Sequence, residues 1–115
     1  MLETIETADA YNSANANSQV VRHGDTLYVS GQVPKDATTG EIVGDEVATQ
    51  TDQVFRNIEA ILSAASTDLD NVIKATVYLQ DKADYATFND AYHEHVSEPY
   101  AGRTTVESAA SRSRC

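Results

Sequence analysis

The sequence has little of several things that mark particular classes of protein. Its 115 residues include one cysteine, two prolines and five glycines. A single cysteine cannot form a disulfide within the chain, which argues against a disulfide-stabilised secreted scaffold and for the reducing cytoplasm. No apolar run approaches the roughly 20 residues of a membrane-spanning helix, and no signal peptide is visible at the N-terminus. We therefore expect a cytoplasmic protein with no membrane partner.

Basic residues are also scarce. Eight Lys and Arg stand against 18 Asp and Glu, which gives a net charge of −10. This charge repels nucleic acid and anionic membranes, so we expect no nucleic-acid partner. The acids are spread evenly along the chain. Two interpretations stay open: adaptation to a high-salt cytoplasm, where counterions screen the repulsion, and simple solubility.

Common cofactor and metal motifs are missing. The sequence has no CxxC, GxGxxG, phosphate loop or HExxH. His93 and His95 are two residues apart in an expected helix, so they point to different faces and cannot share a metal ion. His23 is expected in a turn, and Cys115 is the last residue. We expect neither a metal nor a cofactor.

Hydrophobic periodicity predicts a single α+β domain over residues 1–115, with an atypical tail at residues 108–115. The expected order is β-β-α-β-α-β, with two helices on one face of a mixed sheet. The expected segments are a hairpin within 17–33, a loop at 34–44, a helix at 45–66, a strand within 71–81, a helix within 82–96 and a strand beginning at 103.

The strand within residues 71–81 alternates in character. Its apolar face carries Ile73, Ala75, Val77 and Leu79. The opposite face carries Tyr78 and Thr76. A sheet face of that mixture often packs against another subunit, which hints at oligomerisation.

The last expected strand carries the best candidate for chemistry. Arg103, Thr105 and Glu107 lie on one side of it. An arginine at the start of a strand can present its planar donors to a carboxylate. The alternative from this pattern alone is an ion pair on the protein surface.

Several stretches together resemble one family. "YVSGQVP" is followed by "TGEIVG", a helix, the strand "KATVYLQD", "YATFNDAY" and finally "GRTTVE". In this order and spacing they resemble the Rid/YjgF family of reactive imine and enamine deaminases. The resemblance covers residues 15–107.

The resemblance implies a homotrimer with a chorismate-mutase-like fold and sites in clefts between subunits. It implies hydrolysis of 2-imino and 2-enamino acids, such as 2-iminobutanoate and 2-iminopropanoate, to 2-keto acids and ammonia. The enzyme would be a hydrolase acting on a C=N bond, with a small imino or keto acid as its ligand and no cofactor.

The same resemblance implies site residues. Arg103 matches the arginine that binds the substrate carboxylate, and Ser30 and Gly31 match the pocket wall. Asn89 matches an asparagine lining the cleft; its alternative role is a hydrogen bond on the helix surface. Thr105 matches a position whose main chain holds substrate or water.

The sequence departs from the family pattern at two places. The motif "GPYSQA" is replaced by "NANSQV", which puts Asn17 at the position of a pocket tyrosine and makes the substrate preference uncertain. The family's last strand, resembling "VEIEAIA" with a water-orienting glutamate, is missing after Glu107. A lost reading frame and a divergent natural C-terminus both explain this tail, and we expect impaired activity.

Three functions therefore stay open: an imine deaminase, a ligand-binding or regulatory trimer without turnover, and a truncated remnant without a biochemical role. Neither the physiological substrate nor a salt requirement follows from the sequence.

Overall fold

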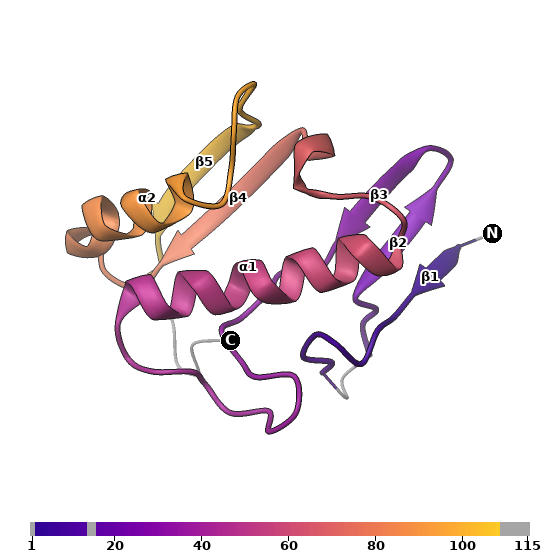
Figure 1. Cartoon of the computed structure of the whole chain (residues 1–115), viewed down its shortest axis with the longest axis horizontal. Helices are drawn as coiled ribbons and strands as arrows, with labels where there is room; N and C mark the ends of the chain where they lie inside the picture. The colour runs from indigo at the N-terminus through magenta and orange to yellow at the C-terminus, as the bar shows by residue number, and fades with distance from the viewer. Residues whose placement is uncertain (1, 14–15, 109–115) are drawn as a thin grey trace.

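The computed structural model describes residues 2–13 and 16–108. Figure 1 shows two helices lying against strands from both halves of the chain. In chain order, the elements are β1 (Glu3–Ile5), β2 (Val20–His23), β3 (Thr26–Val29), α1 (Val47–Ala64), the 3₁₀ turn η1 (Leu69–Asn71), β4 (Lys74–Leu79), the 3₁₀ turn η2 (Lys82–Asp84), α2 (Tyr85–His93) and β5 (Gly102–Glu107).

The predicted element order is correct except that it lacks β1. This strand pairs antiparallel with β2, placing Ile5 opposite Val20. Its three residues are too few to show an alternation, so no sequence pattern marks it. The hairpin expected around "HGD" is present, and Gly24 adopts a φ of 62° in its turn, a conformation that glycine reaches without steric cost.

The strands form two sheets, whereas one mixed sheet was predicted. β1, β2 and β3 form an antiparallel sheet, and β4 pairs parallel with β5. Within residues 2–13 and 16–108, no strand joins β3 to β4. We also predicted that the last strand of the family is absent after Glu107. Residues 109–115 lie outside the described part of the chain, so that absence stays a prediction.

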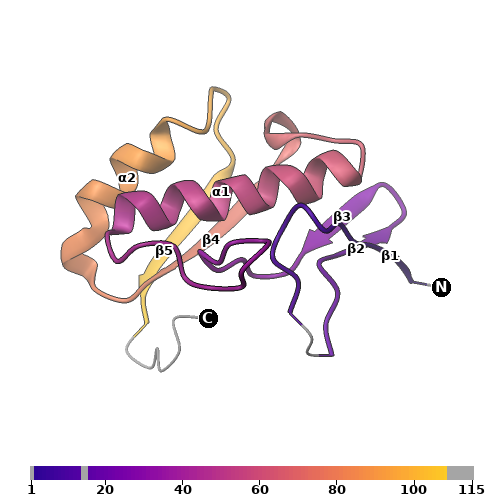
Figure 2. The same cartoon turned by 60° about the horizontal axis from the view of Figure 1, so that its bottom comes forward.

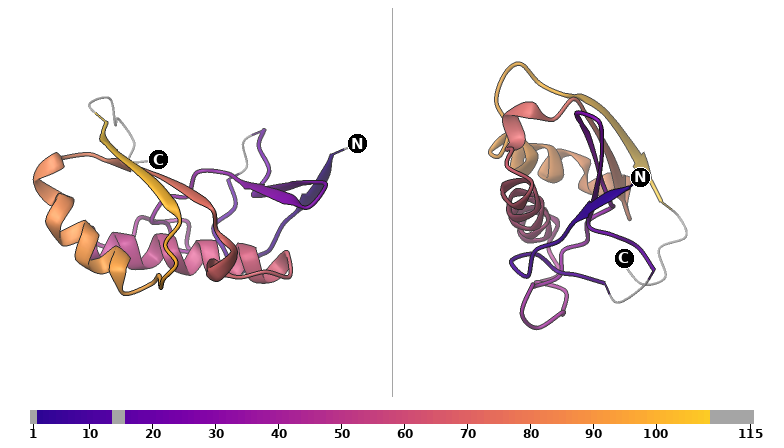
Figure 3. Two further views of the ribbon diagram at one scale, coloured as in Figure 1. Left: turned by 90° about the horizontal axis from the view of Figure 1, so that it is seen from above. Right: turned by 90° about the vertical axis from the view of Figure 1, so that its right-hand side faces the viewer.

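Both helices lie on the same side of the strands, as the left view of Figure 3 shows. α1 runs beneath both sheets, and near its middle Phe55 packs against Tyr92 of α2 with ring centroids 5.4 Å apart. Toward its C-terminal end, Ile61 is buried with Ala10 and Val20 in the core. The predicted α+β layer is thus confirmed, and α1 is the element that holds its two sheets together.

Helical periodicity places the polar residues of α1 opposite its apolar face, toward solvent, but two of them are buried. Gln53 and Asn57 are only 3% and 0% exposed. The Asn57 Nδ2 donates to the carbonyl oxygens of Val33 and Lys35, at 3.2 and 3.0 Å. The loop after β3 crosses this face of α1, and its buried carbonyls need donors that no sheet supplies. These amides therefore fix the loop at residues 33–35.

The sheet faces turned away from the helices carry large exposed side chains. Tyr28 on β3 is 60% exposed, and Tyr78 on β4 is 71% exposed. Val106 lies opposite Tyr78 in the β4–β5 register. Ile73 was predicted to pack with the apolar face of this strand, but it is 81% exposed because β4 begins one residue later, at Lys74.

None of the helices that the structure describes is long and apolar enough to cross a membrane.

Candidate functional site: an arginine clamp and a loop pocket

Arg103 is held by α2. It is the second residue of β5, and the parallel register sets it opposite Ala75. Its Nη2 donates to the Tyr85 hydroxyl and to the Asn89 Oδ1, both at 2.9 Å. We call Arg103, Tyr85 and Asn89 the arginine clamp. Both hydrogen bonds use Nη2, so the donors on Nη1 and Nε remain for a ligand.

Aromatic rings of α2 complete the surroundings of the guanidinium. The Arg103 Cζ lies 4.6 Å from the ring centroid of Tyr92 and 5.6 Å from that of Phe88. Cation–π contact stabilises the guanidinium without neutralising it. Tyr85, Phe88 and Tyr92 recur at helical spacing, which by itself indicates packing, so their contact with Arg103 was not predicted. The sequence signal that could have revealed it is the presence of Asn89, a predicted site residue, on the same helix as these aromatic residues.

Arg103 forms no ion pair with any residue in the described ranges; the ion pairs found there are Arg22–Glu3 and His95–Asp52. Glu107, on the same strand, instead accepts a hydrogen bond from the Lys82 N–H at 3.0 Å. The alternative interpretation of Arg103, a surface ion pair, therefore does not occur in this part of the chain. No acidic side chain in the described residues therefore neutralises the Arg103 guanidinium.

Thr105 lies two residues beyond Arg103 on the same strand, opposite Val77. Its Oγ1 is buried and has no hydrogen-bond partner among the residues described. A buried hydroxyl without a partner costs about 1–3 kcal/mol, so a group that completes its hydrogen bond is favoured there.

Three other predicted residues lie together in a second place. Asn17, Ser30 and Gly31 line a pocket of about 180 Å³, which we call the loop pocket. Ser30 is held firmly: its N–H donates to the Gln19 carbonyl at 3.0 Å, and its Oγ donates to the Ser18 carbonyl. A Cβ built at Gly31 would meet no atom within 4 Å, so the space in front of this backbone is open.

Gln19 organises the other wall of the loop pocket. It is 4% exposed. Its Oε1 accepts from the Thr7 N–H at 2.7 Å, and its Nε2 donates to the carbonyls of Thr7 and Tyr11 at 3.1 and 3.2 Å. The segment from residue 7 to residue 11 is thereby fixed beside the pocket. Neither Gln19 nor Tyr11 was predicted: Gln19 stands in the stretch "NANSQV" without an assigned role, and Tyr11 lies outside the matching motifs.

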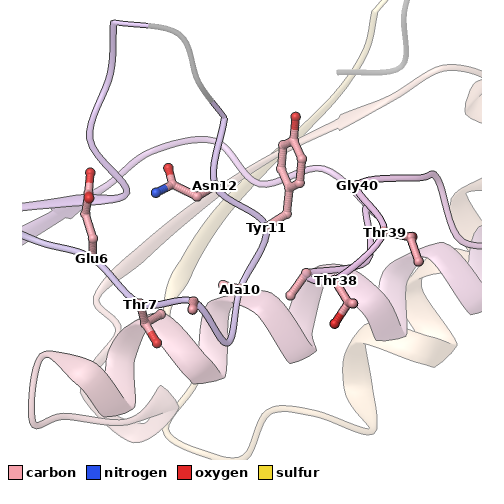
Figure 4. Close-up of a pocket in the computed structure, with 10 residues that line it drawn as sticks. Glu6, Thr7, Ala10, Tyr11, Asn12, Thr38, Thr39 and Gly40 are labelled. Atoms are coloured by element: carbon pink, nitrogen blue, oxygen red, sulfur yellow. The ribbon is translucent and has the colours of Figure 1, made fainter.

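A larger and more open groove of about 500 Å³ adjoins this segment (Figure 4). One wall is the chain around Glu6 and Thr7, and the other is the loop of residues 37–40. Near it, the Asp36 carboxylate accepts hydrogen bonds from the N–H groups of Thr39 and Thr38, at 2.9 and 2.7 Å. These bonds lower the pKa of Asp36.

The arginine clamp and the loop pocket are separate within one chain. No residue that lines the loop pocket belongs to β4, α2 or β5, the elements that carry the clamp and Thr105. Figure 2 shows β3 and β5 at different ends of α1. The structure thus joins Arg103 with Asn89, and Asn17 with Ser30 and Gly31, but does not join the two groups.

The histidines form no metal centre in the described residues, where no group of three or more potential metal ligands occurs. His95 instead contacts the Asp52 carboxylate at 2.7 Å and stacks on Phe55 at 4.4 Å between ring centroids. This side chain links the end of α2 to α1. Cys115 lies outside the described residues.

A match to a protein-family model shows to which family the chain belongs. The family model described as Endoribonuclease L-PSP matches residues 7–114. The chain belongs to this family, which is the Rid/YjgF family. The predicted family is therefore confirmed.

Two curated relatives show the range of names in the Rid/YjgF family. A RutC family protein of Pyrococcus horikoshii is 44% identical over 107 residues, covering 93% of this chain and 85% of the relative. The 2-iminobutanoate/2-iminopropanoate deaminase of Bos taurus is 39% identical over 106 residues, covering 92% and 77%.

Two solved structures confirm the Rid/YjgF fold. RidA from an Antarctic Psychrobacter species has a TM-score of 0.92 and 38% identity, covering 97% of this chain and 90% of that one. Escherichia coli TdcF with bound serine has a TM-score of 0.88 and 34% identity, with the same coverages.

Proposed function

We propose that this protein hydrolyses reactive 2-imino and 2-enamino acids to 2-keto acids and ammonia. One observation carries the proposal: Arg103 is fixed by two hydrogen bonds and an aromatic surround but keeps its charge unpaired within the described residues. Such an arginine suits the carboxylate that every 2-imino acid carries. The bovine deaminase and the serine-bound TdcF structure support this choice of ligand, since both names refer to small molecules with a carboxylate.

The proposed chemistry needs orientation more than activation. The C=N carbon of an imino acid is already electrophilic, and binding its carboxylate at Arg103 fixes the position of that carbon. Water adds to the carbon, the nitrogen takes up protons, and the C–N bond breaks to release ammonia and leave a keto group. The unpartnered Oγ1 of Thr105 is available to hold the water or the nitrogen. Asn89 positions Arg103 and lines the same space. These steps require no cofactor.

We further propose that the working unit is a homotrimer. A single chain separates the arginine clamp from the loop pocket, so a site that uses both requires a second copy. The exposed tyrosines on the sheet faces, Tyr28 and Tyr78, offer an apolar surface for that contact. The substrate would then bind between subunits, with its carboxylate at Arg103 of one and its side chain in the loop pocket of the other.

The description of the matching family names an endoribonuclease, but the charge does not favour one here. A net charge of −10 repels an RNA backbone, and binding to nucleic acid depends chiefly on basic contacts to phosphates. The single cysteine and the small-molecule substrate also fit our prediction of a cytoplasmic protein.

The alternative is a trimer that binds keto or amino acids without turnover, which the same clamp would serve. If the last strand is missing, as predicted, deaminase activity would be impaired and the non-catalytic alternative would be favoured. Turnover is the measurement that separates the two functions.

The test is ammonia release from freshly generated 2-iminobutanoate and 2-iminopropanoate. We expect the full chain to accelerate release above the buffer rate, and Arg103→Ala to abolish most of the acceleration. Lys82→Ala, which removes an exposed cation at η2, is the matched control and should retain the activity. No acceleration by the full chain, together with 2-oxobutanoate binding that Arg103→Ala abolishes, would favour the non-catalytic alternative.

A further inference from the structure

Tyr11 stands between the loop pocket and the groove beside it. Tyr11 and Asn12 are the two residues that line both cavities. Asn12 has a short, exposed side chain, whereas Tyr11 is half-buried and carries a full ring. Figure 4 shows the Tyr11 ring standing between Asn12 and Gly40.

The position of Tyr11 is fixed at both ends of the residue. Its carbonyl accepts from the buried Gln19 Nε2 at 3.2 Å. Its ring packs against the loop on the other side, where Cε1 would lie 3.6 Å from a Cβ on Gly40. The Lys35 Nζ lies 4.9 Å from the ring centroid. A ring held by its backbone and by contacts on its edge and face acts as a wall rather than a swinging side chain.

The two cavities differ in size. The loop pocket measures about 180 Å³, and the groove beyond Tyr11 measures about 500 Å³. Pockets for drug-sized ligands span roughly 300–1,000 Å³, so the loop pocket alone suits only a short side chain. Joined to the groove, it would admit a longer one. Asn17, on the loop-pocket wall, is too small to divide the space in this way.

We propose that Tyr11 sets the length of the substrate side chain, by closing the loop pocket off from the groove. This inference rests on the proposed function, because it assigns the side chain of a 2-imino or 2-keto acid to the loop pocket. The ligand class is accordingly the short aliphatic 2-imino acids. Tyr11 acts here as a specificity-determining residue and takes no part in the chemical step.

The experiment compares a short with a long substrate in matched variants. Tyr11→Ala removes the wall, Tyr11→Phe keeps the ring, and Tyr100→Ala removes a 53%-exposed tyrosine that lines neither cavity. For each variant, kcat/KM is measured with 2-iminobutanoate and 2-iminohexanoate generated in place. The affinities of 2-oxobutanoate and 2-oxohexanoate are measured by calorimetry, which needs no turnover.

We expect Tyr11→Ala to raise the long-to-short ratio about tenfold or more, because the discrimination by a hydrophobic pocket is worth roughly that per excluded group. Tyr11→Phe and Tyr100→Ala should keep the wild-type ratio. If Tyr11→Ala does not fold, Tyr11→Leu shortens the wall while keeping an apolar contact with Gly40, and the same rise is expected.

The outcomes separate this inference from the proposed function. A wild-type protein that handles the short ligand, with a Tyr11→Ala ratio equal to that of Tyr100→Ala, overturns the role of Tyr11 alone. A wild-type protein that neither converts nor binds either ligand overturns the proposed function and the role of Tyr11 with it.

Discussion

The arginine clamp and the loop pocket are built in different ways. The clamp is a charged side chain from β5 supported by α2, with its contacts made by side chains. The loop pocket is mostly loop backbone, held in shape by the buried amides of Gln19 and Asn57. A clamp of this kind recognises a charge that all members of a substrate class share. A pocket of this kind recognises the shape that distinguishes those members.

The first prediction tests the arginine clamp by weakening it while keeping its charge. Arg103→Lys retains a cation but loses the planar donors and the stacking that Tyr92 favours. We expect the affinity for 2-oxobutanoate to fall about tenfold or more, and Arg103→Ala to lower it about a hundredfold, since a hydrogen bond to a charged group is worth roughly 1.5–3 kcal/mol. Calorimetric titration measures both.

The loss should be the same for short and long keto acids, because the clamp binds only the part that they share. Equal binding by wild type and Arg103→Ala would show that Arg103 is not the carboxylate site.

The second prediction tests the support of the loop pocket. Asn57→Ala removes the Nδ2 hydrogen bonds to the Val33 and Lys35 carbonyls, each of which keeps one other donor, the Lys35 N–H and the Gln53 Nε2 respectively. We expect a loss of about 1–3 kcal/mol in the free energy of unfolding, because each of the two lost hydrogen bonds contributes about 0.5–1.5 kcal/mol. The corresponding fall in Tm is on the order of 10 °C for a domain of this size.

Asn71→Ala is the matched control for Asn57→Ala, since Asn71 donates to the Thr67 hydroxyl at an exposed site. It should lower stability by at most about 0.5 kcal/mol. If both variants lose the same stability, the buried amides do not hold the pocket, and the contrast with the clamp fails.

The sequence predicted the clamp better than its surroundings. Arg103 and Asn89 were identified because a charged donor and an amide stand in recognisable motifs. Tyr85 was missed because an aromatic residue at helical spacing indicates packing. Here its ring also lies near the Arg103 guanidinium, and its hydroxyl accepts a hydrogen bond from Arg103. The pairing depends on how α2 lies on β5, which no local pattern contains.

The residues that support the loop pocket were harder to predict for a related reason. Asn57 lies at a position of α1 that periodicity assigns to solvent, yet a distant loop covers it. β1 was missed because Glu3–Ile5 is too short to alternate. Ile73 was misplaced by one residue at a strand boundary. Long periodic segments and charged motifs can be predicted from a single sequence, whereas contacts made across the fold cannot.

The dependence of Tm on salt should report the charge of the whole surface rather than the packing of the clamp or the loop pocket. The ion pairs found in the described residues, Arg22–Glu3 and His95–Asp52, belong to neither the clamp nor the loop pocket. Salt therefore acts mainly on the repulsion among 18 acids and 8 bases. The Debye length falls from ~10 Å at 0.1 M to ~3 Å at 1 M, so we expect Tm to rise by several degrees between these KCl concentrations. A flat or falling Tm would rule out the high-salt interpretation of the composition.

The smallest expected effect concerns Asp36, at the end of the groove that Tyr11 closes off. Hydrogen bonds from the N–H groups of Thr39 and Thr38 favour the charged carboxylate and lower its pKa. A lowered pKa in the folded state means that the contribution to stability is fully present above the ordinary value of about 4 and is lost as the pH falls through the lowered value.

Because Asp36 lies at the surface, Asp36→Asn should lower Tm by only roughly 1–3 °C at pH 6.5, and this difference from wild type should shrink toward pH 3. Asp25→Asn, in the β2–β3 turn, is the control for removing an exposed acid from a chain of net charge −10. Thermal melts at the two pH values measure both variants. A difference for Asp36→Asn that stays constant with pH, or that matches Asp25→Asn, would show that the charge of Asp36 does not hold the loop. The loop of residues 37–40 would then be held in place by contacts other than those of the Asp36 carboxylate.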